Sequence, residues 1–266
     1  MYWQSRLERE DKDAAIKAAI HKIRAANKDY GYRRVHYELR KLGFQLNKKR
    51  TQRIYQSLGI NVKSYGRRYR KYNSYKGVVG RIKPNRINRR FQSSVPYQKI
   101  TTDTTELEYH ELDANGQYRM KKAYLDPYMD LYNSEIVSFM VTKQPNGPSM
   151  LEGLEKAIQK TKDCPYRRLF HSDRGWAYQM PKYQKMLEKH GIFQSMSRKG
   201  NCYDNAPMES FFGILKQEMY YGKTFHSFEE LERAISDFIK YYNETRIKES
   251  LGWQSPVEFR QANLAA

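Results

Sequence analysis

Strand-like segments come first in residues 98–262, and strand-like and helix-like segments alternate after them. A Thr-rich segment leads into the DANG sequence at residues 113–116, which predicts the turn of a hairpin. Pro127 interrupts the region between the next two strand-like segments. The three early strands are expected at residues 99–109, 118–125 and 134–143.

The alternating part ends in two long helices, one from residue 206 to residue 220 and one that runs to Asn243. Ser227 and Glu230 form a capping box at the start of the second helix. Before them we expect helices at residues 148–160 and 181–190 and short strands at residues 168–172 and 192–196. Strands first and alternation afterwards predict an α/β fold, a mixed sheet flanked by helices.

Charge divides the rest of the chain. Between Leu39 and Thr102 there is no Asp or Glu, but there are 18 Lys and Arg residues, and we call this stretch the basic belt. The remainder has 31 basic and 29 acidic residues, so most of the net charge of +20 lies in the belt. Such a belt attracts polyanions, above all nucleic acid, with an affinity that falls as salt rises. The alternative is a solvated basic linker, although Tyr65, Tyr69, Tyr72 and Tyr75 can stack on bases.

Residues 1–60 predict a small helical domain. Apolar residues recur at helical spacing from Asp11 to Ala26, a second helix ends at Gly43, and Asn47 can cap a third helix up to Leu58. Two helices joined by a short turn fit a helix-turn-helix that binds DNA, with a helical hairpin as the alternative. The third helix supplies the expected DNA contacts Lys48, Lys49, Arg50 and Arg53.

Residues 61–97 predict a basic linker, because they have weak periodicity and several Gly and Pro residues. We expect this linker to become ordered mainly on nucleic acid, with Arg67, Arg68 and Arg70 among its DNA contacts.

Composition excludes several classes of protein. No apolar run approaches the roughly 20 residues that span a bilayer, and the charged N-terminus is not a signal peptide. Two cysteines, Cys164 and Cys202, suit a reducing cytosol and do not make a zinc site. We therefore expect a cytoplasmic protein with no membrane partner.

Three acidic residues in separate segments are the candidate catalytic and metal-binding residues: Asp103, Asp173 and Glu209. The last two are separated by 35 residues. Three carboxylates from distant segments can hold two divalent cations beside a phosphodiester. In so basic a chain, that phosphodiester is expected to be a nucleic-acid backbone.

The helix that carries Glu209 has two faces. A core stripe is expected at Met208, Phe211, Phe212, Leu215 and Met219. Glu209, Gly213 and Lys216 follow one another on a neighbouring stripe, which places a metal-binding acid, a glycine that permits close approach and a phosphate-binding lysine along one face. The alternative is a solvated face. Other candidates are interpreted as structural: Asp130 as a turn residue, Asp204 as a helix cap, and His171 as a packed or hydrogen-bonded neighbour of Asp173.

From Gln98 onward the chain resembles the catalytic domain of DDE transposases and retroviral integrases. Within that group it is similar to the downstream (OrfB) subunit of bacterial insertion-sequence transposases that are encoded by two overlapping reading frames. The segments TTDTTEL, LFHSDRGWAYQ and SMSRKGNCYDNAPMESFFGILKQE carry the resemblance, and YGYRRVHYELRKLG matches the upstream helical domain. Two departures are Ile100-Thr101, where the family often has an aromatic residue, and Arg246-Ile247-Lys248, where Arg-Pro-His is common.

The resemblance implies an RNase H-like fold and matching roles. Asp103, Asp173 and Glu209 correspond to the three metal-binding acids, and Lys216 to a contact with the terminal DNA of the element. The expected chemistry is phosphoryl transfer with two Mg²⁺ ions, or Mn²⁺ as a substitute, with Asp103 bridging the ions. Water as the nucleophile cleaves a strand, and the freed 3′-OH then joins it to new DNA.

The implied partners are the element ends, the target DNA, an upstream-frame subunit or a fusion with it, and further copies of the chain on DNA in the bacterial nucleoid. No sustained leucine heptad marks an oligomerising helix. Two alternatives remain: an RNase H-fold nuclease without joining activity, and a non-enzymatic DNA-binding regulator.

Overall fold

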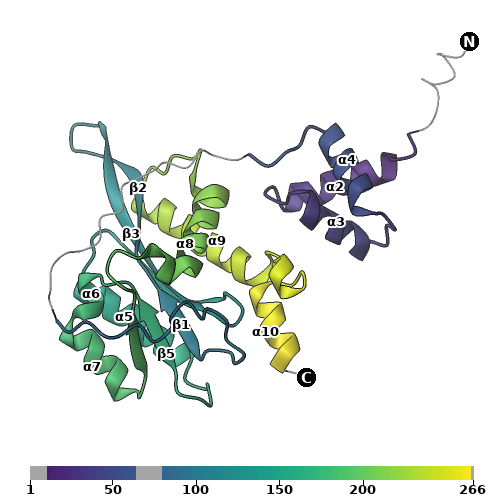
Figure 1. Cartoon of the computed structure of the whole chain (residues 1–266). Coiled ribbons are helices and arrows are strands. Elements are labelled where there is room, and N and C mark those ends of the chain that lie inside the picture. Colours follow the sequence, from purple (N-terminus) through teal and green to yellow (C-terminus); the bar gives the residue numbers. More distant parts are fainter. Residues whose placement is uncertain (1–10, 64–79, 265–266) are drawn as a thin grey trace, which may run out of the picture. The chain divides into compact units, whose positions relative to one another are not determined.

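The computed structural model describes residues 11–63 and 80–264. The chain divides into two compact units, Met1–Gly66 and Arg67–Ala266, which are considered separately (Figure 1). Three helices form the described part of the first unit: α2 (Ala14–Ala26), α3 (Tyr32–Lys41) and α4 (Lys48–Ser57). Asn47 caps α4 as predicted, because its side chain accepts a hydrogen bond from the Arg50 N–H. The apolar stripes of the three helices meet in a small core at Ile20, Val35, Leu39 and Ile54.

A mixed six-stranded sheet is the centre of the second unit. Its order is β2-β3-β1-β5-β6, and β4 pairs with β3. The pairs that involve β2, β3 and β4 are antiparallel, whereas β1, β5 and β6 run parallel to one another. The strands are β1 (Lys99–Thr102), β2 (Thr105–Leu112), β3 (Tyr118–Asp130), β4 (Ile136–Thr142), β5 (Leu169–Ser172) and β6 (Phe193–Met196).

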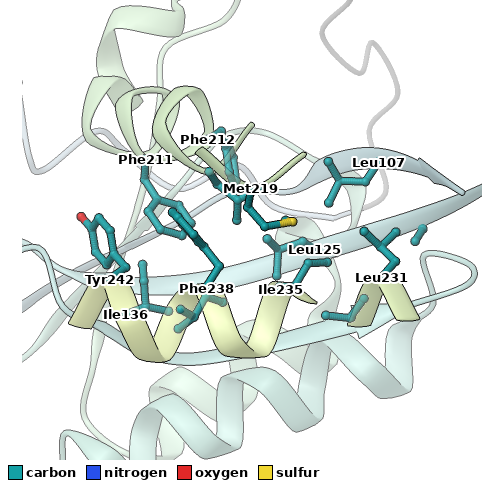
Figure 2. Packing of buried hydrophobic residues seen from close by; sticks show 14 of the residues in the cluster. Leu107, Leu125, Ile136, Phe211, Phe212, Met219, Leu231, Ile235, Phe238 and Tyr242 are labelled. Carbon is teal, nitrogen blue, oxygen red and sulfur yellow. The ribbon is translucent and has the colours of Figure 1, made fainter. Parts of the chain in front are cut away.

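Helices cover both faces of this sheet, which confirms the predicted fold class (Figure 1). One face packs against α5 (Gly147–Lys160), α6 (Trp176–Gln179) and α7 (Pro181–Lys189), in a core that includes Ile100 and Phe170. The other packs against α8 (Ala206–Leu215) and α9 (Phe228–Glu244). In Figure 2, Phe211 and Phe212 of α8 lie opposite Ile235 and Phe238 of α9, with Leu125 of the sheet nearby. The core stripe predicted for α8 is confirmed, because all five of its residues are buried.

The strand predicted at residues 99–109 is broken at Asp103 and Thr104, and this break places the first acid at the middle of the sheet. β1 and β2 pair in succession with β3, with Thr102 opposite Tyr128 and Thr105 opposite Leu125. The two residues of the break therefore face Asp126 and Pro127. We expected an interruption at Pro127, but β3 continues through it. Pro127 faces the break between β1 and β2, and a residue without an N–H is tolerated there.

The described second half of the expected linker, from residue 80 onward, packs against the sheet of the second unit. The N–H groups of Arg86 and Ile87 donate to Ser195 Oγ on the edge strand β6, and the Asn85 and Arg89 side chains donate to Asp204. The prediction that the linker is ordered mainly on nucleic acid is therefore wrong for these residues. Arg67, Arg68 and Arg70 lie outside the described residues.

The C-terminal helix α10 (Pro256–Leu264) packs against α9. In the part of the chain that the structure describes, no helix has the length and apolar character needed to cross a membrane.

Candidate active site

Asp103 and Asp173 directly follow the carboxyl ends of β1 and β5, and these ends lie side by side because the two strands are adjacent and parallel. Thr101 is in register with His171, so each acid follows the matched pair by two residues. The Asp103 carboxylate accepts a hydrogen bond from the Thr104 N–H at 2.8 Å, and Asp173 accepts one from the Gly175 N–H at 2.7 Å. A Cβ atom at position 175 would lie 2.9 Å from the Asp173 carboxylate, which explains the glycine in HSDRG.

Glu209 reaches the site from a different layer. It lies in the first turn of α8, where its side chain is exposed beside the buried core stripe. The residue before α8, Asn205, is hydrogen-bonded to the end of β1. The N-terminal end of α8 is therefore fixed beside the strand that leads to Asp103.

The pKa of Asp103 indicates that the other two predicted acids are near it. Burial raises the pKa of Asp103 well above its usual range, and Asp173, Glu209 and Asp126 raise it further by repulsion, against the lowering effect of the Thr104 N–H. Burial also raises the pKa of Asp173. Mutual repulsion of this kind is relieved when a cation binds. Within the described residues, no group of three or more His, Cys, Asp and Glu side chains is close enough, as arranged, to hold a metal ion.

Asp126 is a fourth acid at this site that sequence reasoning missed. It is buried, accepts a hydrogen bond from the Thr104 hydroxyl, and has its pKa raised to about 6 by burial. The Tyr178 hydroxyl lies 3.5 Å from the same Thr104 oxygen. No motif or spacing in the sequence marks Asp126, because it faces Thr104 only through the register of β2 and β1 on β3.

Two of the three structural interpretations are confirmed. The Asp130 carboxylate accepts hydrogen bonds from the N–H groups of Tyr97 and Tyr132 at the β3–β4 turn. His171 is buried, and its ring nitrogens contact Ser195, Ser197 and the Asp204 carbonyl. Burial lowers the pKa of His171 to about 4, so the ring is neutral near pH 7.

The prediction that Asp204 caps α8 is wrong. Its carboxylate is buried and binds two arginines. Arg198 lies on the loop before α8, and Arg89 lies on the described part of the basic belt after residue 80. The hydrogen bonds from Arg198 are the largest cause that holds the pKa of Asp204 well below its usual range. Two guanidinium groups are the stronger partners of this carboxylate: Arg89 comes from a segment distant in sequence, and Arg198 comes from the loop before the helix.

The expected DNA contacts divide into three groups. Lys48, Lys49, Arg50 and Arg53 are exposed on α4, although Arg50 also pairs with Asp13 at 2.7 Å and Arg53 lies 3.8 Å from it. Lys216 is half-buried in a π-helical turn, η2 (Lys216–Tyr220), that continues α8. Positions 67, 68 and 70 belong to the segment that the structure does not describe.

Models of known families match two separate parts of the chain. Two models described as "Integrase core domain" match residues 93–202 and 209–264, and a model described as "HTH-like domain" matches residues 10–69. The acid trio thus falls within the integrase core matches, and α4 falls within the helical match.

Curated relatives match over most of the chain. The putative transposase InsK for insertion sequence element IS150 of Escherichia coli K12 is 40% identical over 97% of this chain and 87% of its own length. An uncharacterized transposase-like protein of Haemophilus influenzae is 43% identical over 83% of this chain and 95% of its own length. Among solved structures, the HTLV-2 integrase catalytic core domain in complex with magnesium matches 61% of this chain and 95% of its own, with 15% identity and a TM-score of 0.45.

Proposed function

Because this chain belongs to the insertion-sequence transposases that carry an integrase core domain, we propose that Asp103, Asp173 and Glu209 are the metal-binding carboxylates with which it cuts and joins DNA. The protein acts in DNA transposition, and its family transfers polynucleotide strands. The observation that carries the proposal is the placement of Asp103 and Asp173 on matched ends of adjacent parallel strands, with Glu209 close enough to raise the pKa of Asp103.

The residues fit a divalent metal by their chemistry. All three side chains offer carboxylate oxygens, which are the ligands that Mg²⁺ and Mn²⁺ prefer. Bound cations of this kind lower the pKa of an attacking water and stabilise negative charge on a leaving oxygen. Asp103 and Asp173 have their spacing fixed by the sheet, whereas the exposed Glu209 approaches them from α8.

The reaction we propose has two steps at one centre. In the first, a water oxygen attacks phosphorus at the element end, and the bond from phosphorus to the 3′ oxygen breaks to leave a 3′-OH. In the second, that 3′-OH attacks a phosphodiester of the target, so one phosphodiester bond forms as another breaks. The chain holds and orients the DNA through α4 and the basic belt, and no covalent bond to the protein is required.

We also propose that the protein acts as more than one copy on DNA, together with an upstream-frame subunit or fused to it. The proposal follows from the family resemblance, which implies an upstream-frame partner and binding to the ends of the element. In the same proposal, Asp103, Asp173 and Glu209 would hold two Mg²⁺ ions, or Mn²⁺ as a substitute, which would activate the attacking group and stabilise the leaving oxygen.

Replacement of Asp173 by asparagine tests the assignment. The full chain is incubated with supercoiled plasmid and Mg²⁺, or Mn²⁺ in parallel, and nicked product is measured over time. Asp173→Asn should reduce nicking at least about a hundredfold, roughly 2.7 kcal/mol of transition-state stabilisation, and leave DNA binding intact. Asp237→Asn removes an exposed carboxylate of α9 and serves as the control. Wild-type activity of Asp173→Asn would overturn the assignment.

A second assay separates a transposase from a nuclease of the same fold. A duplex with a pre-cut 3′-OH is supplied with plasmid, and joined product is measured. Nicking without any joining, by the chain alone and fused to an upstream-frame subunit, would point to the nuclease.

A further inference from the structure

Asn205 occupies the position from which an asparagine usually caps a helix. It directly precedes α8, and a capping side chain there would accept a hydrogen bond from an N–H of the first helical turn. In the described part of the chain, no backbone N–H of α8 donates to the Asn205 side chain. The side chain is nevertheless buried, with 4% of its residue surface exposed. Its polar atoms are therefore used elsewhere.

Both ends of the Asn205 amide bind the end of β1. The Thr101 hydroxyl donates to Asn205 Oδ1 at 2.5 Å, and Asn205 Nδ2 donates to the Thr102 carbonyl at 3.0 Å. Thr101 and Thr102 are themselves buried. An acceptor and a donor on opposite sides of one planar amide fix both the distance and the direction of approach.

These two bonds connect two of the proposed metal-binding acids by a short path. Thr102 immediately precedes Asp103, and Asn205 lies four residues, about one helical turn, before Glu209. Two ionised carboxylates placed at one site repel each other unless a cation lies between them. Repulsion tends to separate β1 from the start of α8, and the amide bridge opposes that separation.

We propose that Asn205 is a positioning residue that holds Asp103 and Glu209 at the separation a divalent cation requires. This inference rests on the proposed function, because it takes these two carboxylates as ligands of one site. A metal site tolerates displacements of its ligands of only about 0.5 Å, so loss of the bridge weakens metal binding before it abolishes folding. The helix forgoes an ordinary cap bond at this position, which indicates that the link to β1 is the more important role for the side chain.

The chain contains a matched control. Asn243 in α9 uses the same two amide groups, accepting from the Ile136 N–H and donating to the Ile136 carbonyl, each at 2.9 Å. It links a helix to β4, and the acids of the proposed site are on other elements. Asn243→Ala therefore also removes two hydrogen bonds that an asparagine amide makes between a helix and a strand, here from a half-buried side chain.

The test compares Asn205→Ala with Asn243→Ala in the full chain. Mn²⁺ binding is measured by calorimetry without DNA, the Mn²⁺ concentration for half-maximal plasmid nicking is measured separately, and thermal unfolding is recorded without metal. We expect both variants to unfold at lower temperature than wild type. Only Asn205→Ala should weaken Mn²⁺ binding and raise the half-maximal Mn²⁺ concentration, each at least about tenfold. If Asn205→Ala does not fold, Thr101→Val removes one of the two bonds and should shift both metal readouts in the same direction.

Equal metal dependence in the two alanine variants, or unchanged metal dependence in a folded Thr101→Val, would overturn the positioning role. Asp173→Asn in the same assays distinguishes this outcome from failure of the proposed function. If Asp173→Asn is inactive while Asn205→Ala behaves like Asn243→Ala, only the positioning inference fails. If Asp173→Asn keeps wild-type activity, the proposed metal centre itself fails.

Discussion

Asp126 is a buried acid that lies beside the proposed metal ligand Asp103. Its carboxylate accepts the Thr104 hydroxyl bond, and the Thr104 N–H donates to Asp103. One threonine therefore connects the two acids across the break between β1 and β2. Because the Thr104 hydroxyl engages it, we interpret Asp126 as a support for the Asp103 loop, distinct from the three proposed metal ligands.

Asp126→Asn tests that interpretation. The amide keeps an oxygen that can accept the Thr104 bond, so plasmid nicking should stay within about tenfold of wild type, ~1.4 kcal/mol. Asp126→Ala should lose more activity, since it leaves the Thr104 hydroxyl without this acceptor. A loss for Asp126→Asn as large as that for Asp173→Asn would make Asp126 a fourth metal ligand.

The pH dependence of stability gives a second prediction for Asp126. Burial raises its pKa from 3.8 to about 6, so the folded protein binds a proton that the unfolded chain releases between these values. The stabilising contribution is present below pH 3.8 and is lost as pH rises through 6. Relative to wild type, Asp126→Asn should gain up to about 3 kcal/mol in free energy of unfolding between roughly pH 4 and pH 7, measured by urea unfolding without metal. A difference that is independent of pH would contradict the raised pKa.

Single residues also mark where sequence reasoning ends. Asp173 and its Gly175 could be predicted, because a short motif contains both the acid and the glycine that its carboxylate requires. Asp204 and Asn205 could not, since the sequence before a helix favours a local cap. Their partners Arg89, Thr101 and Thr102 come from other segments, and only the tertiary structure brings them within reach, whereas Arg198 lies on the same loop as Asp204.

At the scale of elements, the extent of the helix from residue 206 to residue 220 was predictable, but the π-helical turn at its end was not. Hydrophobic periodicity gave the buried stripe from Met208 to Leu215, and the capping box gave the start of α9, where Ser227 accepts from the Glu230 N–H. The helix widens into a π turn at Lys216, where the Tyr221 N–H donates to the Lys216 carbonyl, and the nearly buried Arg246 pairs with Glu218 of this turn. Because Arg246 and Glu218 are distant in sequence, local helix propensity could not predict this ion pair.

Gly213→Ala tests whether the face of α8 that carries Glu209 approaches DNA closely. A Cβ at this exposed position would meet no described atom within 4 Å, so the alanine variant should be more stable by about 0.5–1 kcal/mol in thermal or urea unfolding. If the glycine permits close approach to DNA, the added methyl group should reduce joining of a pre-cut 3′-OH duplex although the protein itself, measured without DNA, is more stable. Higher stability with unchanged joining would assign this face to solvent.

At the scale of the molecule, charge is concentrated in the first third of the chain and its described parts differ in role. In the part of the belt after residue 80, the Asn85 and Arg89 side chains donate to the buried Asp204. The charge of Arg89 therefore has a structural role. Lys48 and Lys49 of α4 are exposed, whereas Arg50 is paired with Asp13. The two lysines are therefore the clearest candidates for contacts with DNA phosphates on the first unit.

Lys48→Gln combined with Lys49→Gln tests this division by salt dependence. Each phosphate contact contributes about −0.9 to the slope of log K against log salt, so loss of two should make the slope shallower by roughly 1.8. Binding of two unrelated duplexes should weaken equally, because phosphate contacts carry no base information. Anisotropy titrations between about 50 and 200 mM salt measure both quantities. Lys182→Gln with Lys185→Gln changes net charge by the same amount on exposed positions of α7 and is the control. Equal slopes in the two double variants would mean that α4 acts only through net charge, whereas a loss confined to one duplex would mean that it reads bases.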